Sequence, residues 1–416
     1  SGLTANATVS RLLNNDLYTL KTDDDVSDLV FGDTTSTLTI NDMKNAPYDD
    51  PRWEELVNKV TVAEFLDFSA NAFHNIQGIA SVNMPQKAAD DGPGGSDSHY
   101  LNEGGYQGVP YADAADYTSG TRVAPSPVNL AYAWNKELAF ENGEIILGES
   151  TLVLDLPIMI GPGMNIHRHA YNARGVEYYS EDPILSGYGG SAVVQGAQSK
   201  GTLVNIKHMG FNDQEHNRAG ISAYMTEQKF RETDLRGFEG ALSDAFGMGV
   251  MIAFNRIGAT NASHHVGMIQ KIVRGEWGFK GLISTDMMNN YLYFNAESMV
   301  MAGITQVADF AADNSHINLG EGGVDAVWPH ISLATVSKDS NLVEQARENL
   351  KYQLYIFANS AILNISTQRV NTWWDTALTV TTYASSILAV LFFLAWVVLT
   401  LLPEKKPVVV RVENKR

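Results

Sequence analysis

The stretch GFKGLISTDMMNN spans residues 278–290 and places an apolar run, 281–285, directly before a single carboxylate, Asp286. A short apolar run after a glycine predicts a buried strand. An aspartate at its end fits a turn or a helix cap, since aspartate favours both. It equally fits a nucleophile at the mouth of a barrel, so the rest of the chain has to separate the two readings.

Four other runs share this apolar character, and two long amphipathic stretches, 226–246 and 264–279, separate the last three strand candidates. This alternation indicates βα units and a parallel sheet. The span from about 50 to 320 matches the roughly 250 residues of a (β/α)8 barrel. An open doubly wound sheet is the alternative, but the sequence lacks its Gly-rich dinucleotide fingerprint. The other strand candidates are GIASVN (78–83), TLVLDLPIMI (151–160), TLVNIK (202–207) and GVMIAF (249–254).

Residues 48–73 precede these strands and have a helical pattern, with Asp50 as the expected cap and Pro51 at the first helical position. Residues 1–47 are polar and are predicted to be a tail or linker from a preceding module. Because the chain starts at Ser1 rather than at methionine, we expect an earlier segment upstream. The predicted barrel covers 48–320, and a post-barrel segment covers 321–378.

Polar residues follow four of the strand candidates directly. In barrels the chemistry sits at the carboxyl ends of the strands, so these residues predict one shared site. The resulting ring consists of Asp286, Lys207, His208, Arg218, Arg174, Glu177 and Asn255.

A carboxylate among cations stays ionised, and a positioned, ionised carboxylate can attack an anomeric carbon. Lys, Arg, Asp and His side chains also suit the recognition of sugar hydroxyls. Glycoside chemistry is therefore a reasonable prediction. Alternatively, Lys207 and Arg218 could pair with Asp213 or Glu215 at the surface.

Composition excludes several other classes. The net charge of −18 argues against nucleic acid as a partner. The chain has no cysteine, and its Gly-rich turns lack the Lys-Ser or Lys-Thr of a phosphate cradle. His167 and His169 have no carboxylate nearby, which favours local hydrogen bonds over a metal. We predict neither a metal nor a cofactor.

One segment predicts a membrane anchor. Residues 376–403 carry no charge, and about 20 apolar residues suffice to span a bilayer as a helix. Trp373 and Trp374 precede this run, and the tail 403–416 is basic. Positive residues stay in the cytoplasm, so we predict a single-pass helix at 379–402 in the cell membrane, with the barrel extracellular. A buried core helix is the alternative.

Seven segments, in this order, resemble glycoside hydrolase family 3, the β-glucosidase-like family, over residues 48–303. The resemblance implies that Asp286 is the nucleophile and that Asp91 binds the sugar in the glycone subsite. It also implies sugar-hydroxyl ligands at Arg174, Lys207, His208 and Arg218, and a Met and an aromatic beneath the sugar at Met251 and Phe254. The segments are DGPGG, SPVNLAYAWNKELAFENG, GPGMNIHRHAYNARGVEYYSEDPILSG, KHMGFNDQEHNR, TEQKFRETDLRGFEGAL, MIAFNRIGA and VRGEWGFKGLISTD.

The chain also departs from the family pattern, which suggests altered specificity or reduced activity. Ala173 and Gly175 replace the usual neighbours of the arginine, and Phe254 replaces a tyrosine. Met287 stands where many members have an aromatic residue, and Thr305 where they have an aspartate.

A retaining glycosidase needs a second carboxylate, about 5–5.5 Å from the first, as acid/base. The resemblance implies that an α/β-sandwich domain supplies it, yet only about 70 residues separate Gly303 from the anchor. The chain is therefore similar to the barrel half of members with reversed domain order, with the acid/base on an upstream domain or a separate chain.

Three hypotheses follow. The first is an outward-facing, membrane-anchored retaining β-glycosidase that acts on terminal β-linked sugars of oligosaccharides or glycosides. The second is a non-catalytic sugar-binding membrane protein built on a glycosidase barrel. The third is a structural surface protein.

Overall fold

A computed structural model describes residues 17–92, 125–287, 295–308, 338–363 and 373–402, apart from short gaps at 20, 22, 27–28, 71, 73–74, 150–151, 153–154, 171, 213, 217 and 219–220. The chain forms two compact units, Ser1–Ile365 and Ser366–Arg416. The predicted domain boundary at residue 320 and the basic tail 403–416 lie outside the described residues.

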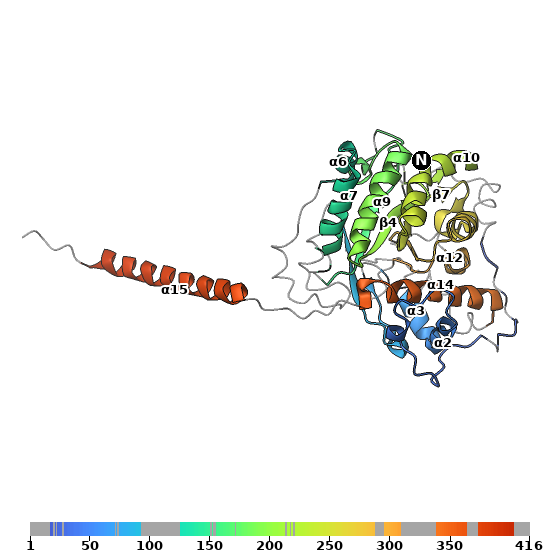
Figure 1. The fold of residues 1–416 in the computed structure, drawn as a ribbon, viewed down its shortest axis with the longest axis horizontal. Coiled ribbons are helices and arrows are strands. Elements are labelled where there is room, and N and C mark those ends of the chain that lie inside the picture. The colour runs from blue at the N-terminus through green and yellow to red at the C-terminus, as the bar shows by residue number, and fades with distance from the viewer. Residues whose placement is uncertain are drawn as a thin grey trace, which may run out of the picture. The chain divides into compact units, whose positions relative to one another are not determined.

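A six-stranded sheet forms the centre of the first unit (Figure 1), and its order is β1-β2-β3-β4-β6-β9. All neighbouring strands are parallel except the β1–β2 pair, which is antiparallel. The strands are β1 (Asn75–Ile76), β2 (Lys87–Asp91), β3 (Ile158–Gly163), β4 (Leu203–Met209), β6 (Gly249–Ile252) and β9 (Leu282–Thr285).

Three of the predicted strands are confirmed, at 202–207, 249–254 and 281–285. The strand predicted at 78–83 is wrong, because these residues form a tight turn with the helical segment η2 (Ala80–Val82). Ile79 and Met84 exchange both backbone hydrogen bonds across this turn, and Asn83 adopts a left-handed φ of 57°. In the segment 151–160 the strand begins only at Ile158, after Pro157, which has no N–H to donate.

Backbone hydrogen bonds close the sheet into a ring. Residues 304–308 bond to β9, through Thr305 N to Ile283 O at 2.8 Å and Thr285 N to Gln306 O at 3.0 Å. The same segment bonds to the chain that leads into β1, through Val307 N to Ser69 O at 2.7 Å and Ala72 N to Val307 O at 3.2 Å. The predicted barrel is thus confirmed as a barrel-like fold, but within the described residues its wall does not have eight parallel strands.

The helix predicted over 48–73 divides into α2 (Arg52–Lys59) and α3 (Val62–Ala70). Asp50 caps as expected, since its Oδ1 accepts from Arg52 N at 2.9 Å, while Pro51 is the N-cap rather than the first helical residue. The chain is extended at Val60, and Thr61 and Glu64 then bond reciprocally at the start of α3. This capping box restarts the helix in a new direction.

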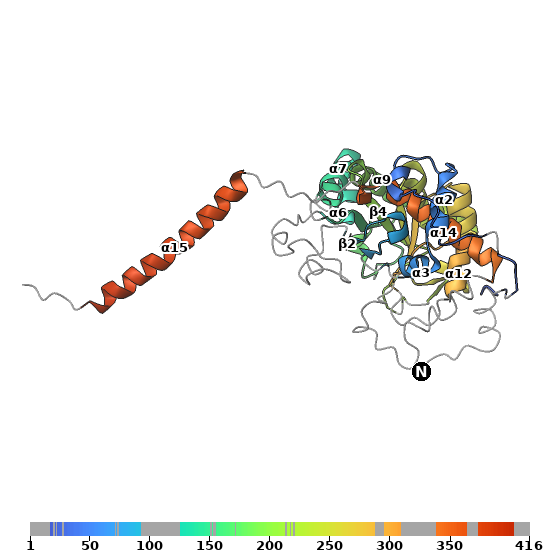
Figure 2. The same cartoon turned by 90° about the horizontal axis from the view of Figure 1, so that it is seen from below.

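The remaining elements surround the sheet, with α7 and α9 on one side and α2, α3 and α14 on another (Figures 1 and 2). They are η1 (Ile40–Met43), α6 (Pro127–Tyr132), α7 (Lys136–Asn142), η3 (Gly143–Glu149), η4 (Gly175–Glu177), α9 (Pro183–Ser199), β5 (Ser222–Ala223), α10 (Glu227–Lys229), η5 (Phe230–Asp234), α11 (Arg236–Glu239), η6 (Gly240–Asp244), β7 (Arg256–Ile257), β8 (Thr260–Asn261), η7 (Ala262–His264), η8 (Gly267–Glu276), α12 (Ala296–Ala302), α14 (Ser340–Ala358) and η10 (Ala361–Leu363).

Helix α14 completes the wall where residues 304–308 lack a full set of strand partners. Asn349 donates to Val300 O at 2.9 Å and to Ile304 O at 3.1 Å, and Gln353 donates to Thr305 O. Both amides are buried, so these bonds satisfy carbonyls that water cannot reach. The helix is therefore part of the barrel and not an appendage.

The second unit contains α15 (Trp373–Leu401). Its segment Thr376–Leu401 has 26 residues and a mean hydropathy of 2.4, and none of its most apolar stretch is buried. By length and composition this helix could cross a membrane. The alternative of a buried core helix does not fit its exposed side chains.

Candidate active site

A cavity of about 390 Å³ opens at the carboxyl ends of the parallel strands. The structure brings seven of the eight predicted site residues to its wall: Asp91, Arg174, Lys207, His208, Arg218, Met251 and Asp286. Phe254 does not line the cavity and is 1% exposed. It lies behind Arg218 instead, with the guanidinium carbon 4.5 Å from its ring centre.

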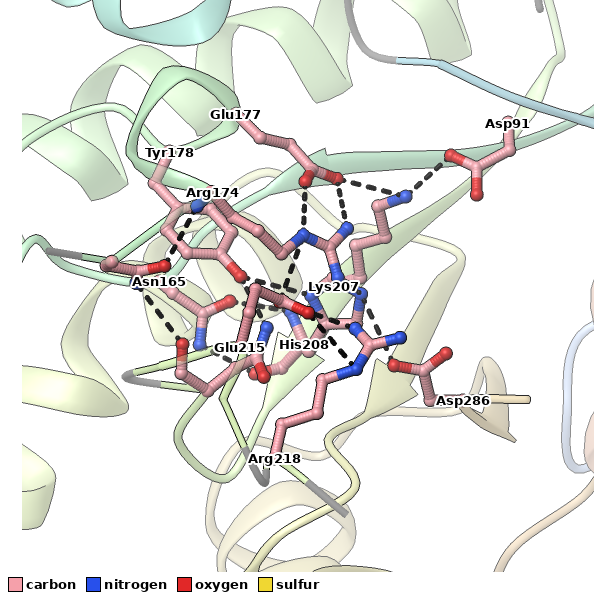
Figure 3. A network of polar contacts seen from close by, with 12 residues as sticks. Asp91, Asn165, Arg174, Glu177, Tyr178, Lys207, His208, Glu215, Arg218 and Asp286 are labelled. Atoms are coloured by element: carbon pink, nitrogen blue, oxygen red, sulfur yellow. Dashed lines mark hydrogen bonds and ion pairs between the residues drawn. The ribbon is translucent and has the colours of Figure 1, made fainter. Parts of the chain in front are cut away.

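One side of the cavity, built on β3, β4 and β2, carries a continuous ionic network (Figure 3). Arg174 binds Glu177 through two hydrogen bonds, of 2.6 and 2.7 Å. Lys207 Nζ then bridges Glu177 Oε1 at 3.1 Å and Asp91 Oδ1 at 2.5 Å. Lys207 therefore pairs within the site with Asp91 and Glu177 rather than with Glu215, and Asp213 lies outside the described residues.

Burial and charge oppose each other in this network. Burial alone would raise the pKa of Glu177, but the nearby Lys207 and Arg174 outweigh it and hold the pKa below its usual value. For Lys207, burial acts to lower the pKa, and Asp91 and Glu177 outweigh it and raise the pKa. Glu177, Lys207 and Arg174 consequently stay ionised at neutral pH.

Asn165 binds the backbone of His208 and Arg174 binds its ring, and the ring is neutral. Its backbone N–H donates to Asn165 Oδ1, and its backbone carbonyl oxygen accepts from Asn165 Nδ2, both at 2.8 Å. Arg174 Nη1 lies 3.1 Å from the ring Nε2, which must accept because a guanidinium can only donate. Burial, followed by the charges of Arg174, Lys207 and Arg218, lowers the pKa of His208 well below its usual value.

Asp286 follows β9 on the other side of the cavity and is 6% exposed. Its Oδ1 accepts from Met287 N at 2.8 Å, whereas Oδ2 has no hydrogen-bond partner among the described residues. His208 Nε2 is 3.5 Å from Oδ2 but cannot donate to it while it accepts from Arg174. Burial raises the pKa of Asp286 to about 6, against the opposing effects of Arg218, the Met287 N–H, Arg174 and Lys207. Asp286 thus carries one desolvated carboxylate oxygen without a hydrogen-bond partner among the described residues.

Several residues of the site were not predicted from the sequence. Glu215 lines the cavity and pairs with Arg218 at 3.2 Å, so the predicted alternative of an Arg218–Glu215 pair is realised inside the site. Tyr178 receives a hydrogen bond of 2.6 Å from Asn212 and lies 3.5 Å from His208 Nδ1. Asn165, Asn212 and Glu215 stand in the polar segments after β3 and β4, which is the only signal that pointed to them.

The departures from the family pattern occupy different places. Ala173 and Gly175 flank Arg174 in its loop, and Met287 lines the cavity. Thr305 is 1% exposed, and its hydroxyl bonds to both Ile283 N and Ile283 O. Thr305 therefore joins the barrel wall and does not reach the site.

Metal ligands are a separate question. His167 bonds locally, with its Nε2 3.0 Å from Tyr178 O. Within the described part of the chain, no group of three or more His, Asp or Glu side chains could hold a metal ion.

Comparison with known proteins supports the resemblance to glycoside hydrolase family 3. The family model "Glycosyl hydrolase family 3 N terminal domain" matches residues 98–307. "Probable beta-glucosidase K" of Emericella nidulans is 32% identical over 238 residues, which are 57% of this chain and 26% of the relative. "Exo-alpha-(1->6)-L-arabinopyranosidase" of Bifidobacterium breve is 31% identical over 221 residues, which are 53% of this chain and 28% of the relative.

Among solved structures, β-glucosidase 3B from Thermotoga neapolitana in complex with α-D-glucose has a TM-score of 0.64 and 26% identity. The match covers 76% of this chain and 44% of the enzyme. The chain spans about a quarter of the length of the curated relatives that it matches.

Proposed function

Because this chain belongs to glycosyl hydrolase family 3, through the N-terminal domain of that family, we propose that it hydrolyses terminal β-linked sugars by a retaining mechanism with Asp286 as the nucleophile. The observation that carries this proposal is the free Oδ2 of Asp286, buried at the wall of the cavity. Every other carboxylate at the site is already paired with a cation.

In the first step, Asp286 Oδ2 attacks the anomeric carbon, and the bond from that carbon to the leaving oxygen breaks. The leaving oxygen takes a proton from the acid/base. Water then attacks the same carbon, gives its proton to the acid/base and releases Asp286. In the sugar-binding role, Lys207, Arg174 and His208 meet the hydroxyls, and Arg218 faces the reacting centre from its stacked position on Phe254.

We propose that a domain outside this chain supplies the acid/base. A proton donor must be protonated before the leaving group departs. Asp91 and Glu177 accept from Lys207, and Glu215 pairs with Arg218, so each of these carboxylates is already engaged by a cation. The relatives are about four times as long as the matched region, which leaves room for such a domain, for example an α/β-sandwich.

The second candidate function is sugar binding without catalysis. The observation in its favour is Phe254, which offers no hydroxyl to the neighbourhood of Asp286. For either function we propose a single-pass membrane protein, with α15 in the lipid bilayer, the barrel outside and the basic tail inside. The exposed, uncharged segment Thr376–Leu401 of α15 supports the span, and the basic tail supports the orientation.

The test is covalent trapping with a 2-deoxy-2-fluoro-β-glucoside that carries dinitrophenolate as leaving group. This leaving group departs without a proton, so the experiment does not need the acid/base. We expect one glycosyl unit per chain, located by mass spectrometry on Asp286, and none in Asp286→Asn. Asp244→Asn, an exposed carboxylate outside the cavity, is the matched control. Binding of glucose without trapping would favour the sugar-binding function, and absence of both would contradict both functions.

A further inference from the structure

A second hollow, of about 330 Å³, lies beside the loop that carries Arg174. Arg174 lines the active-site cavity, whereas its neighbours Ala173 and Gly175 line this hollow, which we call the outer groove. Helix α6 contributes Val128 and Tyr132 to the groove. Within the described part of the chain, the cavity and the groove share no lining residue. The outer groove is therefore a separate hollow, and its volume falls in the range of ligand pockets, about 300–1,000 Å³.

Two aromatic side chains are exposed at the end of α6, next to the outer groove. Tyr132 lines the groove and is 73% exposed. Trp134 follows two residues later, is also 73% exposed, and has a left-handed φ of 49°. A bulky residue with a positive φ is strained, and such strain is most often found at functional sites. Burial accounts for neither ring, and exposed aromatic rings are typical of contact surfaces.

Gly175 keeps the outer groove open. Its backbone is not in the left-handed region that favours glycine. A Cβ added there would meet nothing within 4 Å among the described residues. Neither conformation nor packing therefore requires a glycine, which costs more conformational entropy on folding than alanine does. The consequence of glycine at this position is the room that it leaves in the groove.

The wall of the groove also carries polar groups. His167 and His169 both line it, and imidazole nitrogens donate to or accept from hydroxyl groups. His167 Nε2 is bonded to Tyr178 O at 3.0 Å, which fixes the orientation of this ring. The groove thus combines an exposed aromatic ring with imidazole groups.

We propose that the outer groove binds one sugar unit of a glycan chain, with the ring of Tyr132 against the apolar face of the pyranose; the choice of a β-linked glucose chain rests on the proposed function. A pyranose has an apolar face of C–H groups and a rim of hydroxyls, which match an aromatic ring and imidazole nitrogens. The loop of Arg174 separates the groove from the cavity, where the proposed function places the terminal sugar. A long glycan that occupies both sites at once gains affinity through its effective concentration.

Calorimetric titration with cellotetraose and laminaritetraose tests this site. The full chain is used with its cavity blocked by the trapped 2-deoxy-2-fluoroglucosyl unit, so that only binding outside the cavity is measured. We expect saturable binding of at least one tetramer, and about 3- to 10-fold weaker binding in Tyr132→Ala, the loss expected for one aromatic contact. Tyr132→Phe should keep the affinity, because the ring remains.

Three further measurements make the test specific. Tyr224→Ala is the matched control, because Tyr224 is 74% exposed and lines neither hollow. Gly175→Leu should also weaken tetramer binding, since its side chain takes up room at the groove, and should leave the thermal midpoint unchanged. The trapping rate should be the same in Tyr132→Ala as in the wild type, because Tyr132 does not line the cavity.

The outcomes separate the two proposals. Trapping without binding of either tetramer would overturn the inference and leave the proposed function intact. Tetramer binding that is unchanged in both Tyr132→Ala and Gly175→Leu would overturn it as well. If no glycosyl unit is trapped, the unblocked chain is titrated instead. Binding that then weakens in Tyr132→Ala would support the groove while the proposed function fails.

Discussion

The carboxylates on the two sides of the cavity have opposite electrostatic environments. On the side of β3 and β4, Glu177 is bonded to Arg174 and Lys207, and these cations lower its pKa. On the side of β9, Asp286 is more deeply buried, with its side chain 8% exposed against 15% for Glu177. It has one oxygen without a partner among the described residues, and burial raises its pKa to about 6. In the function proposed above, the first side holds the sugar and the unpaired carboxylate oxygen on the second side attacks it. The predictions below test this division.

The largest expected effect is on the side of β9. Asp286→Asn should slow trapping by the fluoroglucoside at least about 10³-fold, which corresponds to about 4 kcal/mol in the barrier. Glucose affinity should change by no more than a few-fold, because the sugar is held by the opposite side. Trapping kinetics and calorimetry measure the two quantities. Loss of glucose binding in this variant would show that the two sides do not divide chemistry from binding.

The next largest effect is on stability. Glu177→Gln leaves two buried cations with less compensation, and breaking a buried ionic network costs about 3–5 kcal/mol. Denaturant unfolding at pH 7 measures the free energy of unfolding.

Its matched control is Glu276→Gln. Glu276 pairs with Arg231 at 2.6 Å, but its side chain is 51% exposed. Exposed pairs contribute less than about 1 kcal/mol. Similar losses in the two variants would contradict a special role for the buried network.

The third prediction is a gain in the free energy of unfolding, not a loss. The pKa of Asp286 rises from 3.8 to about 6 on folding, so the folded protein binds this proton more tightly than the unfolded chain does. Stability from this group is therefore full below pH 4 and declines as pH rises through 6, by up to about 3 kcal/mol. Asp286→Asn should consequently be more stable than the wild type at pH 7, with no difference at pH 3.5.

The wild-type trapping rate reports the same ionisation, since only the ionised carboxylate attacks. It should increase as pH passes 6 and then level off. A rate that is flat between pH 5 and 8 would disagree with the raised pKa.

The smallest effect is expected for Asp91→Asn, the isosteric counterpart of Asp286→Asn. Its carboxylate sits at the open end of the ionic network, with a side chain 31% exposed, and accepts from Lys207. Loss of a charged acceptor should weaken glucose binding about 10-fold and leave the trapping rate at saturating sugar nearly unchanged. A large drop in that saturating rate would place Asp91 in the chemistry itself.

Much of the site was predictable because parallel strands end on one face. Lys207 stands near the end of β4 and Asp286 just after β9, and the ends of both strands can be read from apolar runs. Asp91 ends β2, whose sequence KAADD is not an apolar run, so only the family resemblance pointed to it. Phe254 was misplaced because it lies three residues after Met251, and in an extended segment an odd spacing turns side chains to opposite faces. Glu215 was treated only as a surface partner, because loop geometry brings it inward and no periodic pattern records that.

The wall of the barrel was less predictable than its site. Residues 304–308 make isolated strand-like bridges, such as that from Gln306 to Ser284, and α14 satisfies part of their backbone through Asn349 and Gln353. These contacts join positions more than 40 residues apart, which no local pattern reveals. Gln306, which lines the cavity, was missed for the same reason, since it belongs to this segment.

The contribution of α14 to the wall also sets an order of events during synthesis. A ribosome adds about 5–20 residues per second, and domains generally fold as units while the chain emerges. The carbonyls of Val300, Ile304 and Thr305 acquire their amide partners only when Asn349 and Gln353 have emerged. The apolar residues of α15 begin at Trp373, only 15 positions after α14 ends at Ala358. The residues that complete the barrel wall and the apolar helix α15 are therefore synthesised within seconds of each other.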